Sequence, residues 1–132
     1  MNKKRIVLYA DDDIDDKNWV REACKSLNSS LQIEFVETGR SVLDYLKSSD
    51  GIDRPSLIVL DLNMPELDGR QTLKALKSNP SYKDIPVVIV TTSSNTIDKD
   101  VCKRLGASLF LIKPNNYADW QKIVNQFEPY VA

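Results

Sequence analysis

The sequence has no histidine and only two cysteines. Without histidine it cannot form a His-ligated zinc site, a Ser-His-Asp triad or a Cys-His nucleophile pair. The cysteines, Cys24 and Cys102, form no CxxC motif, and each lies within an apolar helical pattern. We therefore expect two buried, reduced thiols and no disulfide.

Long hydrophobic runs and a strong excess of one charge are also absent. The apolar run at residues 6–10, which follows a basic start, is far too short for a signal peptide or a membrane span. The net charge of −1 gives no electrostatic reason to expect a nucleic acid or an acidic membrane surface as partner. For these 132 residues we expect one domain, residues 1–132, in the cytoplasm, with no nucleic-acid or membrane partner.

What the sequence does contain is a fivefold alternation of strand and helix patterns. Short apolar runs typical of strands occupy residues 6–10, 57–60, 87–90 and 109–112, and residues 32–36 alternate like a less buried strand; a helical pattern follows each. In the fourth helix, Ile97, Val101 and Leu105 form the apolar stripe and Gly106 marks the end. The alternation predicts the α/β class, with a five-stranded parallel sheet covered by helices on both faces. We expect a doubly wound (βα)5, flavodoxin-like three-layer sandwich with strand order 2-1-3-4-5.

The third predicted strand ends on a carboxylate. Residues 57–60 are the four apolar residues of a buried strand, and Asp61 follows them directly. Pro65 and the turn Asp68-Gly69 come soon afterwards, so the chain leaves the sheet at Asp61. Ligands of open α/β sheets bind just outside the carboxyl ends of the strands. Asp61 is therefore placed for chemistry.

Polar side chains follow three of the other strands. Asp11 and Asp12 come after the first strand, Thr91 after the fourth and Lys113 after the fifth. Because the strands are parallel, these residues should meet Asp61 at one edge of the sheet. Neighbouring carboxylates repel unless a cation relieves them, and Mg²⁺ prefers a few carboxylates together with water and phosphate oxygens. With Mg²⁺ on one side and Lys113 on the other, Asp61 could attack a phosphoryl group, and Thr91 could hydrogen-bond one phosphoryl oxygen.

Each of these residues has a simpler interpretation when it is taken alone. The acidic run 11–13 could only cap the helix that follows it, where the helix dipole favours negative charge. Asp61 could be a turn residue, Thr91 a β-branched residue at a strand end, and Lys113 a solvated lysine. Their joint placement on successive strand ends of one sheet favours a shared site over separate coincidences.

This combination resembles the receiver domain of two-component response regulators over nearly the whole chain. The residues that carry the resemblance are Asp11-Asp12, Asp61-Leu62-Asn63-Met64-Pro65 with Asp68-Gly69, Thr91, Gly106-Ala107 and Lys113-Pro114. Together they form a highly specific signature, whereas any one of them alone would be weak. The loops at residues 61–69 and 79–84 are similar to those of small stand-alone, CheY-like regulators, including regulators paired with phytochrome-type kinases.

The resemblance implies a phosphoacceptor signalling domain, not an enzyme, that assists its own phosphorylation and dephosphorylation. Asp61 would accept the phosphoryl group from a sensor histidine kinase. Mg²⁺ would be held by Asp11, Asp12 and Asp61, together with the backbone carbonyl of Asn63. The acidic run is three residues long, so a slip of one residue would make Asp12 and Asp13 the metal pair instead.

The resemblance also implies a conformational switch. Thr91 and Lys113 would bind the phosphoryl oxygens, and Phe110 stands at the position of the family's switch aromatic, although a plain core aromatic explains it equally well. The Lys113–Pro114 bond is usually cis in the family. Phosphorylation would change the surface of the fourth helix, fifth strand and fifth helix, which would bind a downstream protein or a phosphotransfer protein. A monomer or weak homodimer is expected. The chain departs from the family at Thr92, where the family usually has Ala, Gly or Ser.

Three other kinds of protein share part of this pattern. A phosphatase of the haloacid-dehalogenase kind requires a second aspartate two residues after the nucleophile, where this chain has Asn63. A flavodoxin-like cofactor binder requires a phosphate loop after the first strand, where three aspartates would repel phosphate. A degenerate receiver that only binds partners would not be expected to keep the complete acidic, Thr and Lys set. The phosphoacceptor interpretation is therefore favoured.

Overall fold

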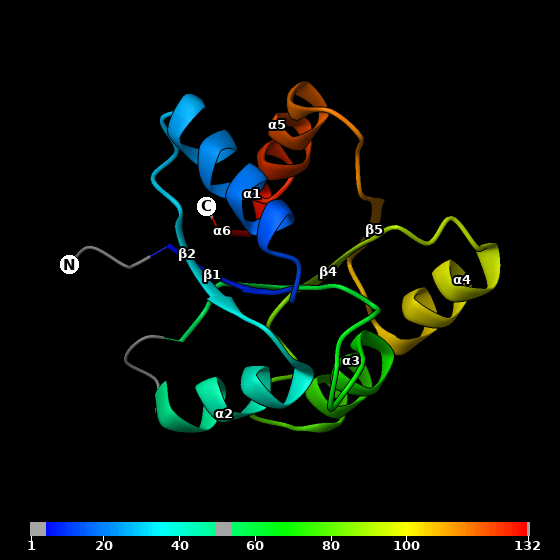
Figure 1. Cartoon of the computed structure of the whole chain (residues 1–132). Coiled ribbons are helices and arrows are strands. Elements are labelled where there is room, and N and C mark those ends of the chain that lie inside the picture. Colours follow the sequence, from blue (N-terminus) through cyan, green and yellow to red (C-terminus); the bar gives the residue numbers. More distant parts are fainter. Residues whose placement is uncertain (1–4, 50–53, 132) are drawn as a thin grey trace.

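The structure, a computed structural model, describes residues 5–49 and 54–131 (Figure 1). Most of the basic start and part of the loop before the third strand lie outside these residues. The strands are β1 (Ile6–Ala10), β2 (Gln32–Val36), β3 (Leu57–Leu60), β4 (Val87–Thr91) and β5 (Leu109–Ile112). The helices are α1 (Ile14–Ser26), α2 (Gly39–Ser49), α3 (Gly69–Ser78), α4 (Thr96–Leu105), α5 (Tyr117–Asn125) and α6 (Glu128–Val131).

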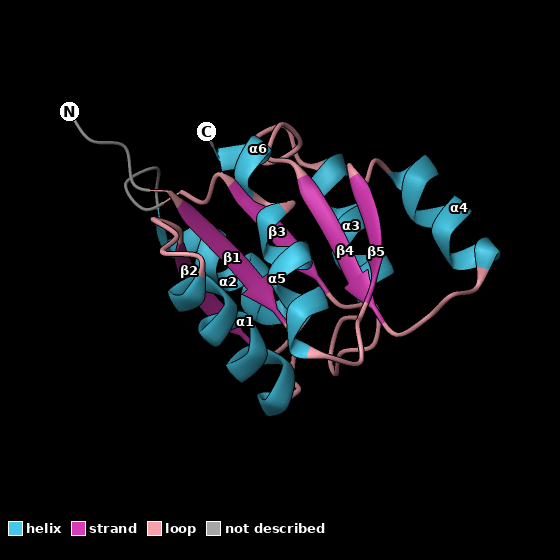
Figure 2. Cartoon of the chain, turned by 90° about the horizontal axis from the view of Figure 1, so that it is seen from above, coloured by secondary structure: helices cyan, strands magenta, loops and turns pink. Residues whose placement is uncertain are grey.

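All five strands pair in parallel, in the order β2-β1-β3-β4-β5. The predicted fold class and strand order are therefore confirmed. Figure 2 shows the strands running in one direction, so the loops that follow them gather along one edge of the sheet. This edge, which we call the carboxyl edge, carries the candidate residues.

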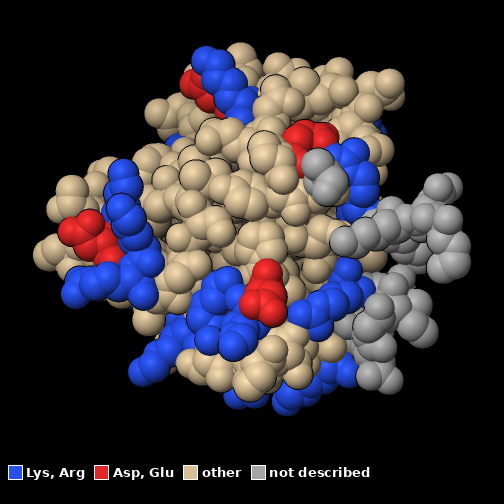
Figure 3. Space-filling view, turned by 180° about the vertical axis from the view of Figure 1, so that it is seen from behind, with Lys and Arg blue, Asp and Glu red and all other residues tan. Residues whose placement is uncertain are grey.

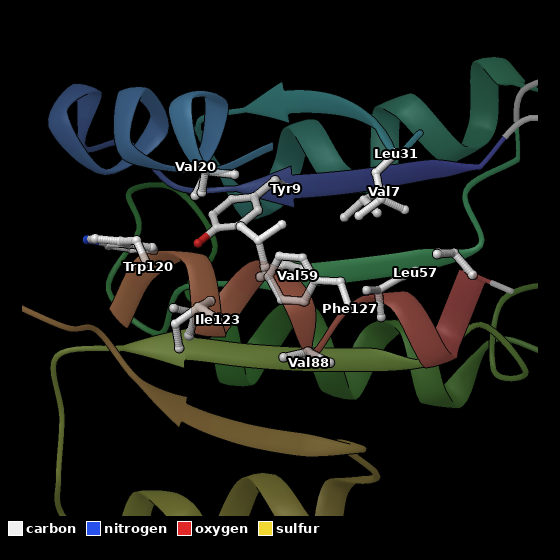
Figure 4. Close-up of a cluster of buried hydrophobic side chains, with 14 residues drawn as sticks. Val7, Tyr9, Val20, Leu31, Leu57, Val59, Val88, Trp120, Ile123 and Phe127 are labelled. Carbon is white, nitrogen blue, oxygen red and sulfur yellow. The ribbon is translucent and has the colours of Figure 1, made fainter. Parts of the chain in front are cut away.

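Helices cover both faces of the sheet. Helices α1 and α5 lie together on one face, and α2, α3 and α4 lie on the other (Figure 1). Successive strand residues point to opposite faces. In β1, for example, Val7 and Tyr9 enter the core beneath α1 and α5, whereas Leu8 and Ala10 enter the core beneath α2 to α4. We call the first of these the α1–α5 core; Figure 4 shows its side chains converging between the helices and the sheet.

Local sequence explains where the helices begin and end. Asp13 caps α1, because its carboxylate accepts hydrogen bonds from the backbone N–H groups of Asp15 and Asp16. Asp68 caps α3 in a reciprocal capping box with Gln71. Helix α4 ends at Gly106, whose φ of 107° lies in the left-handed region that glycine adopts without strain.

Two sequence expectations about this fold need correction. Ile97 is 68% exposed and not part of a buried stripe; Cys102 supplies the buried side chain of α4. The spacing of Ile97 is helical, but α4 packs against α3 and β5 through a neighbouring face. The Lys113–Pro114 bond is trans, since the described residues contain no cis peptide bond; trans is the form that X–Pro bonds favour by about 0.5–1 kcal/mol.

The thiols are both free, as expected, with Cys102 buried and Cys24 only partly buried. Residues 128–131 form the short helix α6, in which Val131 is buried and Glu128 pairs with Arg5, the residue before β1. No helix among the described residues is long and apolar enough to cross a membrane. The face in Figure 3 carries charges of both signs, with basic side chains gathered in its lower part.

Candidate functional site

The site begins where β1 and β3 end side by side. The register pairs Ala10 with Leu60, and the backbone N–H of Asp61 donates to the carbonyl of Ala10 at 3.1 Å, so the pairing continues beyond the last strand residues. Asp11 and Asp61 therefore leave the sheet as neighbours. By strand alternation both lie on the side of the α1–α5 core.

Three carboxylates gather at this point. Asp11, Asp12 and Asp61 each offer an oxygen, and these oxygens all lie within 4.8 Å of one another. Asp11 and Asp61 are buried, whereas Asp12 is exposed. Asp13 turns away into the cap of α1. The structure thus groups Asp11 with Asp12, and not Asp12 with Asp13, around Asp61.

Lys113 reaches into this cluster from the end of β5. Its Nζ lies 2.8 Å from Asp61 Oδ2 and 2.9 Å from Asp11 Oδ2. It also lies 2.6 Å from Asp16 Oδ2, and its side chain is only 8% exposed. Burial alone would lower the pKa of this ammonium, but the bonds to Asp16, Asp61 and Asp11 outweigh burial and raise the pKa above its usual value.

The charged form of Asp11 is disfavoured by burial. Burial raises the pKa of Asp11 from 3.8 to about 6, although the backbone N–H of Asp13 and the Lys113 ammonium both act to lower it. Its Oδ2 is buried and forms an ion pair with the Lys113 ammonium at 2.9 Å, with no further hydrogen-bond partner. Clustered carboxylate oxygens with one such unsatisfied atom are a donor set that fits a hard divalent cation.

Asp61 itself is held at both oxygens. Its Oδ1 accepts from the backbone N–H of Asn63 at 3.3 Å, and its Oδ2 accepts from Lys113. The side chain of Asn63 is exposed. The backbone of Gly69, at the start of α3, lies directly against Asp61 and bonds the carbonyl of Leu62 at 3.0 Å. The position of Asp61 therefore depends on close backbone packing at the start of α3.

Thr91 and Phe110 lie on the other side of the sheet. Phe110 packs against the core beneath α2 to α4, and Thr91 shares the face of Val87 and Ile89 by strand alternation. Phe110 pairs with Ile89 in the register, which places it diagonally beside Thr91. Among the described side-chain contacts, none joins Thr91 or Phe110 to Asp61. The backbone N–H of Lys113 does donate to the Thr91 carbonyl at 2.7 Å, which links the two groups.

Two side chains near the site were not foreseen. Asp16 lies in the first turn of α1 and contacts Lys113, yet the acidic stretch from 11 to 16 does not show which carboxylates face the sheet. Tyr9 is fully buried, and its hydroxyl has no hydrogen-bond partner. Burial raises the pKa of Tyr9, and the charges of Asp11, Asp16 and Asp61 raise it further. The alternation of β1 could have indicated that Tyr9 and Asp11 share a face.

Comparison with known proteins gives the same assignment for almost the whole chain. Residues 7–125 match the family described as the response regulator receiver domain. Response regulator Rcp1 of Synechocystis sp. is 33% identical over 132 residues, which cover 98% of this chain and 90% of Rcp1.

Two crystal structures show the same fold. That of the phosphorylated cyanobacterial phytochrome response regulator RcpA has a TM-score of 0.87 and 30% identity, covering 98% of this chain and 94% of RcpA. That of Mn²⁺-bound Rcp1 has a TM-score of 0.82 and 34% identity, covering 94% of this chain and 91% of the other. The chain therefore belongs to the response regulator receiver domain family, whose members are signalling phosphoacceptors and not enzymes in the usual sense.

Proposed function

We propose that this chain is a single receiver domain, residues 1–132, that accepts a phosphoryl group on Asp61 from a sensor histidine kinase in a Mg²⁺-dependent reaction. One observation carries the proposal. Asp61 directly follows the central strand β3, where it lies among the clustered carboxylates and contacts the buried ammonium of Lys113. The pairing of Glu128 with Arg5 joins the two ends of the described chain and supports one domain.

In the proposed reaction, an Asp61 oxygen attacks phosphorus and the bond from phosphorus to the kinase histidine nitrogen breaks. The product is an acyl phosphate on Asp61, and the imidazole leaves with its electron pair and takes up a proton. Asp11, Asp12 and Asp61 would hold Mg²⁺ together with the carbonyl of Asn63. When bound, this ion neutralises charge on the transferred group.

Lys113 and Thr91 would hold the phosphoryl oxygens. The Lys113 ammonium already lies 2.8 Å from Asp61 Oδ2, so it can pair with a negatively charged phosphoryl oxygen after transfer. The Thr91 hydroxyl accepts from the backbone N–H of Ser93 at 3.3 Å, and its own proton remains available for a bond to phosphate. A movement of Thr91 toward phosphate would open space on the face where Phe110 packs.

The output surface would be formed by α4, β5 and α5. Ile97 on α4 and Ile112 on β5 are large apolar side chains that are 68% and 44% exposed, which supports protein binding there. Phosphorylation shifts this surface only as far as the phosphoryl group contacts the two conformations differently. The partner would be a downstream protein or a phosphotransfer protein, and the chain itself a monomer or weak homodimer.

The upstream partner would be a histidine kinase of the phytochrome type. Support comes from the similarity to RcpA, which is described as a phytochrome response regulator. We place the protein in the cytoplasm, where such a kinase presents its phosphorylated histidine. The small net charge of −1 supports binding to a protein and not to nucleic acid or a membrane.

The test is incubation with acetyl phosphate and Mg²⁺, followed by intact-mass measurement. We expect one added phosphoryl group that depends on Mg²⁺ and is lost in Asp61→Asn. Asp44→Asn, which changes an exposed aspartate of α2, serves as the matched control and should be phosphorylated like the wild type. No added group in folded protein that binds Mg²⁺ would contradict the proposal and favour a degenerate receiver.

A further inference from the structure

The Lys113 ammonium is shared among three carboxylates, and one of them lies outside the metal-binding cluster. Asp11 and Asp61 belong to that cluster, whereas Asp16 does not. The contact with Asp16 is the shortest of the three, at 2.6 Å, compared with 2.8 Å to Asp61 and 2.9 Å to Asp11. An ammonium has three N–H donors, so Asp16 takes a full share of its bonding.

The structure of α1 holds Asp16 in this position. Its backbone N–H donates to the capping carboxylate of Asp13 at 3.1 Å, and its own side chain is 17% exposed. The neighbouring Asp15 has the same charge and the same cap, but it is exposed and lines a surface hollow with Trp19. Of the two acidic residues in the first turn, only Asp16 is directed at Lys113.

Lys113 and a divalent cation would draw on the same carboxylates. The ammonium contacts Asp11 Oδ2 and Asp61 Oδ2, two of the carboxylates that would surround the cation. Two positive groups held by the same carboxylates repel each other, so we expect Lys113 to loosen its hold on Asp11 or Asp61 when the cation binds. A buried ammonium that lost these partners with no replacement would be strongly destabilised.

We propose that Asp16 is a positioning residue that retains Lys113 at the edge of the pocket when a divalent cation occupies Asp11 and Asp61. The inference rests on the cation site of the proposed function. Because Asp16 still bonds the displaced ammonium, it lowers the free-energy cost of moving Lys113 away from Asp11 and Asp61. Asp16 therefore favours binding of the cation. It also keeps the ammonium beside Asp61, within reach of an incoming phosphoryl oxygen.

The experiment is a calorimetric titration with Mg²⁺ alone of the wild type, Asp16→Asn, Asp15→Asn, Lys113→Met and the double variant Asp16→Asn/Lys113→Met. Loss of one charge-assisted bond predicts that Asp16→Asn raises the Mg²⁺ dissociation constant about tenfold. Asp15→Asn removes the same charge from the same helical turn and should raise it at most about twofold. In the Lys113→Met background, Asp16→Asn should also raise the Mg²⁺ dissociation constant at most about twofold.

Two results would overturn this inference alone. One is an Asp16→Asn effect no larger than that of Asp15→Asn. The other is an equal effect with and without Lys113, which would show that Asp16 acts only through its charge. If Asp16→Asn does not fold, Lys113→Met tests the competition on which the inference depends: tighter Mg²⁺ binding supports it, and unchanged or weaker binding overturns the inference. A wild-type protein that binds no Mg²⁺ would overturn the proposed cation site together with this inference.

Discussion

Gly69→Ala should damage the candidate site through the backbone. A Cβ added at Gly69 would lie 2.4 Å from the carbonyl oxygen of Asp61, 2.7 Å from the Cα of Leu62 and 3.0 Å from the carbonyl carbon of Asp61. These atoms are all backbone, so no side-chain rotation can relieve the overlap. Overpacking of this kind costs about 1–3 kcal/mol, and the gain in helix propensity from alanine offsets at most about 1 kcal/mol of it.

Gly106→Ala is the matched control. Gly106 has a φ of 107°, so alanine there adds about 1–2 kcal/mol of backbone strain. Its new Cβ would meet only the flexible side chain of Lys77, at 3.2 Å. Gly106 precedes β5 and therefore lies at the edge of the sheet opposite the site. The two variants should lose similar stability, of about 1–2 kcal/mol, at opposite ends of the sheet.

The assay pairs urea denaturation with the rate of phosphorylation by acetyl phosphate and Mg²⁺. We expect both variants to unfold at lower urea. Only Gly69→Ala should slow phosphorylation, by about tenfold or more, because small displacements of a reacting group are costly to rate. The reasoning would be refuted if Gly69→Ala kept the wild-type stability and rate, or if Gly106→Ala slowed phosphorylation as much.

Three further predictions concern the acidic run and the end of β4. Asp13→Ala removes a cap that accepts two backbone N–H groups, and should lower the free energy of unfolding by about 1 kcal/mol in urea; no change would argue against the cap. Thr92 is an exposed side chain at the carboxyl edge, where it would crowd the access of water to the phosphate. Thr92→Ala should therefore speed the loss of phosphate, followed by intact mass over time; an unchanged half-life would count against this crowding. Burial raises the pKa of Asp11 to about 6, so in metal-free protein the folded state binds the extra proton between about pH 4 and 6. This proton stabilises the folded state by up to about 3 kcal/mol at the lower pH, and the stabilisation is lost as the pH rises. Asp11→Asn should therefore flatten the dependence of the free energy of unfolding on pH, measured by urea denaturation. An unchanged dependence would contradict the assignment of this proton to Asp11.

The strand ends were predictable from the sequence because they depend only on the order of elements. Once a parallel sheet is expected, Asp61 and Lys113 must share its carboxyl edge, and the structure places them 2.8 Å apart. Asp16 could not be identified in the same way. Its contact with Lys113 depends on the rotation of α1 about its axis, which the cap at Asp13 fixes and which a run of similar carboxylates does not reveal.

Two wrong expectations have equally specific causes. Ile97 has helical spacing with Val101 and Leu105, but spacing does not show whether a neighbouring element covers that face of α4, and Ile97 is exposed. The cis form of the Lys113–Pro114 bond was expected by resemblance alone, and the bond is trans. No residue pattern in the chain determines the isomer of that bond.

The identity of the phosphorylated residue tests the central claim most directly. The protein is phosphorylated with acetyl phosphate and Mg²⁺, reduced with borohydride, which converts an aspartyl phosphate to homoserine, digested, and sequenced by tandem mass spectrometry. The account predicts homoserine at position 61 and aspartate at positions 11, 12 and 16. Homoserine at any of those three positions, or an unreduced Asp61 in protein that carries the phosphoryl group, would contradict it.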